Sequence, residues 1–339
     1  MSDYSTNCQN KLNKTFDVSL NSLAKKENFK PCYDRHLQYL KDGRKLPFSF
    51  EDFQAAFRAK DFFKDLFDCG SWLEFRWYIK SDITKLHTSN FCKRDKLCPA
   101  CAVRRAYKQQ LKFMQILEVD PHLKNKDWYY IVIPIKHDIS QNFETVFKRL
   151  NDIRKKIVDS LNGGRKGKTH NIWSSFAGGM YSIETTRSKN GWNVHLNLMI
   201  NASKGTKIPL KSIRNRRGQL SSQNDEIRAF LMKYADSQMH NVKKIEDNSK
   251  IRDDLVEVLK YSLKFSDLTN QELLEVFIKT RKKRLFGSFG NMYGKNIENV
   301  ELDGDEIIDE EFLELIFRRS YGFYELESEK LKRIKNDND

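Results

Sequence analysis

The 339-residue chain has no long apolar run and no internal repeat. No stretch approaches the roughly 20 apolar residues that a membrane helix needs. The opening residues, MSDYSTNCQNKLNKTFD, lack the apolar core of a signal peptide. These absences argue against a membrane-spanning or secreted protein. They predict a soluble, cytoplasmic chain with no membrane partner.

Acidic side chains are too few to balance the basic ones. Lys and Arg number 61 and Asp and Glu 46, which gives a formal net charge of +15. An excess of this sign favours polyanionic partners such as nucleic acids, although charge alone does not establish one. The basic segments LNGGRKGKTHN, KSIRNRRGQL and KTRKKRLFGSFG either reach phosphates or form solvated loops. Their DNA-contact candidates are Arg214, Arg216, Arg217, Lys282, Lys283 and Arg284.

The main part of the chain alternates between strand-like and helix-like patterns. The aromatic and β-branched runs WYYIVIPI, GGMYSIETT and WNVHLNLMI predict strands, and Asn190-Gly191 predicts a hairpin turn between the last two. Amphipathic segments predict helices at residues 50–66, in one piece or two, and at 102–117, 143–161, 224–238 and 253–265. This mixture predicts an α+β fold with a central antiparallel sheet and flanking helices.

Changes in composition divide the chain into four parts. Residues 1–60 predict a helical or irregular segment, and residues 61–115 contain the crowded cysteines. Residues 116–295 contain the predicted sheet, and residues 296–339 predict an acidic amphipathic helix followed by a frayed tail.

Three of the six cysteines lie within FCKRDKLCPAC. In a reducing cytosol such crowding favours metal ligation over disulfides, and tetrahedral zinc takes four such ligands. Cys92, Cys98 and Cys101 supply three ligands. Cys69 is the preferred fourth because Gly70 permits a tight turn, and His87 is the competitor. Such a zinc is structural because no coordination site stays open. The alternative is a set of unligated, buried thiols.

Two arginines directly follow the cysteine cluster. Arg104 and Arg105 either bind DNA phosphates or lie on a solvated helix face.

Polar side chains interrupt the apolar strand WNVHLNLMI. Residues two apart point to one face of a strand, so His195 and Asn197 project together. Glu184 lies on the preceding strand, and hairpin pairing brings its carboxylate beside His195. An imidazole, an amide oxygen and a carboxylate suit Mg²⁺ or Mn²⁺. The alternative is a polar row that faces solvent.

The predicted helix DDLVEVLKYSLKF carries an acid, a phenol and an amine on one stripe. Glu257, Tyr261 and Lys264 lie at i, i+4 and i+7. A phenol with a pKa of about 10 attacks a phosphate only with help from a metal or a cation, which Lys264 supplies. Glu257 is placed to act as a general base. The alternative is a solvated helix face with Tyr261 half-buried.

The order of these motifs, from about Cys69 to Gly290, resembles the rolling-circle replication initiators of small bacterial plasmids in the HUH endonuclease superfamily. FCKRDKLCPACAVRRA resembles the family's cysteine motif, YSIETT its acidic strand, and NVHLNLM its metal-binding histidine motif. LKYSLKFSDLT resembles its tyrosine motif, and RLFGSFG the glycine-containing segment that follows. The resemblance implies an RRM-like or ferredoxin-like nickase domain at residues 116–295, after a zinc-binding element.

The resemblance implies a single-tyrosine nickase that acts on single-stranded or hairpin origin DNA. Tyr261 would attack the phosphodiester and become joined to the 5′ phosphate, with Lys264 as its helper. His195 and Glu184 would hold the catalytic Mg²⁺ or Mn²⁺. Glu257 stands where one branch of the family carries the carboxylate that activates water for termination. Host helicase and polymerase are the implied partners.

One position departs from the family's motif. Two histidines normally flank a bulky apolar residue, and here the second is Asn197, whose amide oxygen is a weaker ligand. Two rival functions remain at this point: a zinc-dependent DNA-binding regulator that does not cut, and a related nickase that mobilises or transposes DNA.

Overall fold

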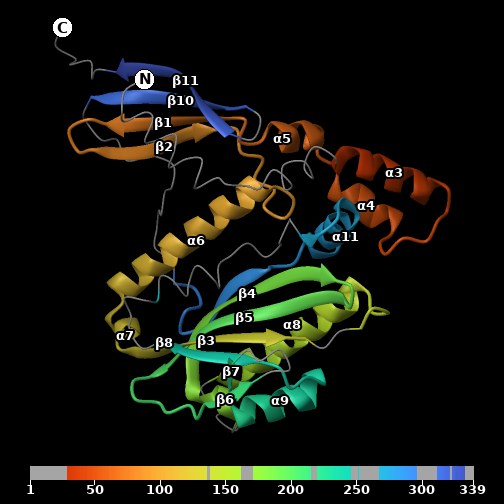
Figure 1. The fold of residues 1–339 in the computed structure, drawn as a ribbon, viewed down its shortest axis with the longest axis vertical. Coiled ribbons are helices and arrows are strands. Elements are labelled where there is room, and N and C mark those ends of the chain that lie inside the picture. The colour runs from red at the N-terminus through yellow and green to blue at the C-terminus, as the bar shows by residue number, and fades with distance from the viewer. Residues whose placement is uncertain are drawn as a thin grey trace. The chain divides into compact units, whose positions relative to one another are not determined.

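A computed structural model describes residues 29–135, 138–161, 171–214, 220–245, 251, 267–295, 311–320 and 323–332. Two compact units account for them: a first unit within Met1–Lys108 and Asn299–Asp339, and a second unit within Gln109–Glu298. Figure 1 shows the elements of both. Within the described ranges, no helix combines the length and apolar character needed to cross a bilayer.

The first unit begins with three helices, α3 (Phe29–Lys41), α4 (Phe50–Ala56) and α5 (Phe62–Asp68). The helix predicted at residues 50–66 is therefore two helices. Helix α4 begins where the Ser49 side chain accepts a hydrogen bond from the backbone N–H of Asp52. The rings of Tyr33, Phe53 and Phe57 pack together, with centroids 4.8 to 5.2 Å apart. Aromatic burial therefore holds these short helices together.

A four-stranded antiparallel sheet completes the first unit. Its order is β11 (Phe323–Lys332), β10 (Phe312–Ser320), β1 (Trp72–Tyr78) and β2 (Ile83–Ser89). Leu73, Leu315 and Phe317 are fully buried in its core. The strand predicted from SWLEFRWYI is confirmed as β1, whereas β2 had no clear signal in the sequence.

The acidic C-terminal helix predicted within residues 296–339 is wrong for the part that the structure describes. Residues 312–320 and 323–332 form the hairpin β10–β11 instead. Leu315 and Phe317 alternate toward one face and lie opposite Phe75 and Leu73 of β1. This long-range pairing outweighs the local preference for a helix. The hairpin also belongs to the first unit rather than to a separate C-terminal part.

The second unit is built on a five-stranded antiparallel sheet. Its order is β8 (Asn241–Ile245), β3 (Lys126–Pro134), β5 (Gly191–Ser203), β4 (Phe176–Ser188) and β9 (Phe286–Gly290). The predicted strands are confirmed as β3, β4 and β5. The α+β expectation with a central antiparallel sheet is likewise confirmed. The glycine-containing segment RLFGSFG contributes the edge strand β9, where a Cβ on Gly290 would meet Ala177 O at 2.3 Å.

The hairpin between β4 and β5 turns through two residues. Ser188 lies opposite Gly191, so Lys189 and Asn190 form the loop, one residue earlier than predicted. Gly191 adopts a φ of 106°, and a Cβ there would lie 2.8 Å from the carbonyl oxygen of Asp138. Glycine is therefore required by both the conformation and the close approach.

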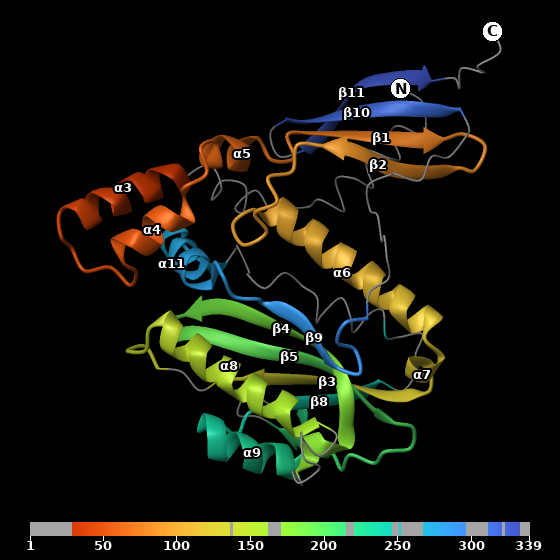
Figure 2. The same cartoon turned by 180° about the vertical axis from the view of Figure 1, so that it is seen from behind.

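Helix α8 (Phe143–Ser160) covers one face of this sheet, as Figures 1 and 2 show. Phe143 at its start packs on Trp192 of β5, with ring centroids 5.1 Å apart. The even-numbered β5 residues Val194, Leu196 and Leu198 point to the same side as Trp192 and are fully buried. Helix α8 thus encloses the main core of the second unit.

The opposite face of the sheet carries His195, Asn197 and Met199, and we call it the histidine face. Its apolar half is buried beneath the second half of helix α6 (Pro99–Val119): Phe113 of α6 stacks edge-on against Trp128 of β3 at 5.5 Å. Met180 and Met199 belong to the same apolar cluster. The histidine face is therefore divided into a covered apolar half and a polar half.

The remaining elements surround this sheet. They are α7 (Pro121–Lys124), the 3-10 helix η2 (Ile172–Ser175), the hairpin β6 (Lys211–Arg214) and β7 (Leu220–Gln223), α9 (Asp225–Ala235) and α11 (Asn270–Thr280). The predicted helices at 102–117, 143–161 and 224–238 are confirmed as α6, α8 and α9. Residues 253–265 lie outside the described residues.

Candidate functional site

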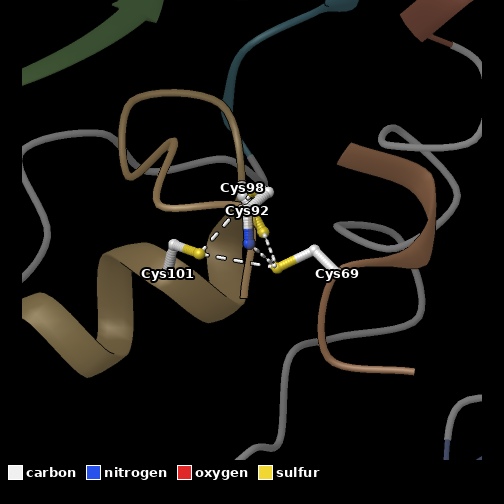
Figure 3. Close-up of side chains that lie close together, drawn as sticks. All are labelled: Cys69, Cys92, Cys98 and Cys101. Carbon is white, nitrogen blue, oxygen red and sulfur yellow. Dashed lines mark hydrogen bonds between the residues drawn. The ribbon is translucent and has the colours of Figure 1, made fainter. Parts of the chain in front are cut away.

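Four cysteines meet in the first unit at the junction of α5, β2 and α6 (Figure 3). The Sγ atom of Cys69 lies 3.5 Å from that of Cys101 and 3.4 Å from that of Cys98. Cys92 Sγ lies 3.6 Å from Cys101 Sγ. All four sulfur atoms lie within 4.8 Å of one another. Zn–S bonds of about 2.3 Å in a tetrahedron place sulfur atoms about 3.8 Å apart, so the cluster can hold a metal such as zinc.

The turn at Cys69 has the features of a metal-binding knuckle. Cys69 ends helix α5, and Gly70 follows with a φ of 66°. The backbone N–H of Cys92 donates to Cys69 Sγ at 3.2 Å. The Asn90 side chain donates to the carbonyl oxygen of Asp68 and to Ser71 Oγ, both at 2.7 Å. These bonds fix the end of β2 against the turn before any metal binds.

Without a metal, the thiols of Cys69 and Cys101 resist ionisation because their pKa values are raised, whereas hydrogen bonds from Cys101 and Cys69 lower the pKa of Cys92. Hydrogen bonding to the Cys69 thiol, then to those of Cys92 and Cys98, and burial together raise the pKa of Cys101. Adjacent thiolates repel each other, and a bound dication reverses this preference because it stabilises the thiolate form. The donor set therefore fits a soft divalent metal with four protein ligands.

His87, the competing fourth ligand, has other partners. Its Nε2 atom lies 2.6 Å from an Arg76 guanidinium nitrogen and 3.8 Å from Glu74 Oε1. Cys69 occupies the fourth position of the cluster instead. The arrangement favours Cys69 over His87, and Cys69 as the fourth zinc ligand stays a prediction.

Two residues that support the cysteine cluster were not predicted from the sequence. The Tyr324 hydroxyl donates to the carbonyl oxygen of Gly70 at 2.8 Å, and the Arg319 guanidinium donates to that of Cys69 at 3.4 Å. Burial raises the pKa of Tyr324 to about 12, so the phenol stays protonated as a donor. Both residues come from the β10–β11 hairpin, which is 250 or more positions further along the chain. No local signal in the sequence connects them to the cysteines.

The polar half of the histidine face brings three predicted residues together. Glu184 of β4 lies directly opposite His195 of β5. The Asn197 side-chain nitrogen lies 3.5 Å from Glu184 Oε2, and Asn197 is buried. His195 Nε2 lies 2.8 Å from the side-chain oxygen of Asn193, which orients the ring. A carboxylate, an imidazole and an amide thus share one patch of the sheet, with Glu184 and His195 half-buried.

The residues predicted to perform the chemistry, Glu257, Tyr261 and Lys264, lie outside the described residues. Ile251 precedes these residues in the sequence. It is 1% exposed and belongs to the same apolar cluster as Met180 and Met199. Ile251 therefore packs on the histidine face.

The predicted DNA-contact residues differ in their surroundings. Arg105 forms an ion pair with Asp95, and the Arg104 guanidinium lies 4.4 Å from the Phe91 ring centroid, so both have structural contacts. Arg214, Lys282, Lys283 and Arg284 are exposed. Arg216 and Arg217 lie outside the described residues. Contact of any of these side chains with DNA stays a prediction.

Comparison with curated proteins gives one partial similarity. The chain is 24% identical over 139 residues to Protein rep of Staphylococcus aureus. The match covers 40% of this chain and 56% of the relative, so the chain spans about half the length of the curated protein it matches. No family model matches the chain. No solved structure matches it either. The chain is therefore similar to a Rep protein over part of its length.

Proposed function

We propose that the chain is a rolling-circle replication initiator that nicks one strand of its origin through a phosphotyrosine intermediate. Similarity to Protein rep supports the replication role. The observation that carries the nicking mechanism is the patch on the histidine face, where Glu184 lies opposite His195 and within 3.5 Å of Asn197. The four-cysteine cluster of the same chain is proposed to hold a structural zinc, for which its four sulfur atoms are suitably close together.

The donors of this patch fit a hard divalent cation. Glu184 offers a carboxylate oxygen, Asn197 an amide oxygen and His195 an imidazole nitrogen, a mixture that suits Mg²⁺ or Mn²⁺. Such an ion supplies Lewis-acid polarisation of the scissile phosphate. Asn193 holds the imidazole ring through the 2.8 Å hydrogen bond to Nε2.

Tyr261 is the proposed nucleophile. Its phenolic oxygen attacks the phosphorus atom, and the bond from phosphorus to the 3′ oxygen breaks. The tyrosine becomes joined to the 5′ phosphate, and the leaving oxygen takes a proton to give a 3′ hydroxyl that primes synthesis. Lys264 stabilises the phenolate. The position of Ile251 on the histidine face supports this assignment because the chain continues from there toward Tyr261.

Glu257 is proposed to activate the water that ends the cycle. A single tyrosine then suffices, because water rather than a second phenol cleaves the regenerated origin. With Glu257→Ala, we expect a normal first nick and a loss of released circular single strands. Normal release from this variant would contradict the assignment.

A strand-cleavage assay tests the proposed function. The substrate is supercoiled DNA that carries the gene and its flanking sequence, incubated with Mn²⁺. The protein is expected to convert it to the open-circular form. Glu184→Gln and His195→Ala should slow this step by about 10- to 100-fold or more, since loss of even an outer-shell partner of a metal ligand costs that much. Glu226→Gln, an exposed substitution on α9, is the matched control. Tight binding of DNA without any cleavage would favour the non-cutting regulator instead.

A further inference from the structure

A cavity of about 400 Å³ opens beside the histidine face of the second unit. It lies between α6, β4, β9 and the turn that follows β9. Its floor is apolar and buried, formed by Phe113, Met180 and Met292. The proposed chemistry uses none of these side chains.

Two further aromatic rings, besides Phe113 in the floor, line the cavity. Phe286 is half-buried, whereas Tyr293 is 74% exposed. The exposed Tyr293 ring beside the apolar floor offers a flat surface on which a planar partner can stack. Aromatic side chains of this kind are the platforms on which unpaired bases stack.

The charges around the cavity are of one sign. Lys112, Arg284 and Lys295 line it, and no Asp or Glu is among the described lining residues. Asp120 neutralises part of this charge through its ion pair with Lys295. Gln109 and Ser288 add hydrogen-bonding groups. A nucleotide matches this lining. Its base is a flat ring system with a polar edge, and its phosphate is an anion.

The position of the cavity favours a nucleotide within a strand over a free one. Met180, Ser182 and Glu184 alternate along β4 and point to one face, so the cavity lies about 13 Å from the candidate active patch. Ser288 lies opposite Met180 on β9. Helix α6 contributes residues from its interior, so the described lining residues include no helix N-terminus of the kind that holds a polyphosphate.

We infer that this cavity binds one unpaired base of single-stranded DNA, with the adjacent phosphate at Arg284 and Lys112. The inference rests on the proposed function, because the strand is the one that passes the active patch. The base stacks on Tyr293 or Phe286 above the apolar floor. It therefore anchors the single strand a short distance from the phosphate to be cut.

Fluorescence anisotropy with two labelled oligonucleotides of equal length tests the inference. One is oligothymidylate, and the other has an abasic backbone with the same charge. Tyr293→Ala should weaken binding of oligothymidylate about ten-fold and leave binding of the abasic strand unchanged, because only the stacking contact is lost. Arg284→Ala should weaken both. Tyr293→Phe should bind oligothymidylate with the wild-type affinity, because the aromatic ring is kept.

Lys155→Ala is the matched control, since Lys155 is 64% exposed on α8, which covers the other face of the sheet. Its affinity for both strands should be unchanged. If the wild type binds and nicks DNA but Tyr293→Ala binds oligothymidylate normally, the cavity is not the base site and the proposed function stands. If the wild type binds no single strand, both proposals are wrong.

Discussion

Cys98→Ser is expected to remove the metal from the cysteine cluster and to unfold the segments that it joins. Cys98 is fully buried, and its sulfur lies 3.4 Å from Cys69 Sγ. The ligands come from the end of α5, the loop after β2 and the start of α6, so the metal closes the loop between Cys69 and Cys92.

The magnitude follows from two free energies. Structural zinc contributes about 10–16 kcal/mol of binding free energy in small domains, and the unfolding free energy of a whole domain is about 5–15 kcal/mol. Loss of one ligand therefore removes stabilisation comparable to the total for the first unit. The polar contacts of Asn90 and Tyr324 are worth about 1 kcal/mol each and cannot compensate.

Elemental analysis and limited proteolysis measure the two consequences. The wild type should contain about one equivalent of zinc, and Cys98→Ser should contain none and be cleaved rapidly between residues 69 and 101. Cys32→Ser is the matched control, because Cys32 lies on α3 outside the cluster. A wild type without metal, or a Cys98→Ser variant that keeps a full equivalent, would refute the reasoning.

Three further predictions concern the second unit and are measured by denaturant unfolding. Gly191→Ala should lower the unfolding free energy by about 2 kcal/mol, because a φ of 106° disfavours a side chain and Asp138 O lies 2.8 Å from the new Cβ. Asn201→Ala should cost about 2 kcal/mol, because it leaves the half-buried amide of Asn291 and the carbonyl of Gly178 without the Asn201 partner. Burial lowers the pKa of His240 below 6.5, so the unfolded chain binds the proton first. The contribution of neutral His240 to the unfolding free energy is complete above pH 6.5 and is lost as the pH falls through the folded-state pKa. A His240→Gln variant should lack this pH dependence of the unfolding free energy. A variant with the same pH profile as the wild type would contradict the assignment.

Elements with a strong local pattern could be predicted from the sequence. Helix α8 has its apolar residues at helical spacing, and the strands β3 to β5 are rich in aromatic and β-branched residues. Strand β2, with the sequence ITKLHTS, was missed because its residues are half-buried or exposed and its pairing with β1 defines it. The segment of β10 was predicted as a helix and part of β11 as a frayed tail, because their partner β1 lies far away in the sequence.

The candidate sites show the same division between local and long-range information. The clustering of the four cysteines could be predicted because three of them lie close together in the sequence and their chemistry is specific. The support from Tyr324 and Arg319 could not, because it depends on the pairing of β10 with β1. The proximity of Glu184 to His195 followed from the hairpin register, whereas the base cavity required the packing of α6 on the sheet. Tyr261 as the nucleophile stays a prediction.

The central claim is tested most directly by mass spectrometry of the protein after incubation with single-stranded DNA from its own origin and Mn²⁺. The wild type should form an adduct that survives denaturation, with the DNA fragment joined to the peptide that contains Tyr261. The Tyr261→Phe variant should bind the same DNA and form no adduct. A wild type that binds this DNA without forming the adduct, or an adduct that persists in Tyr261→Phe, would contradict the account.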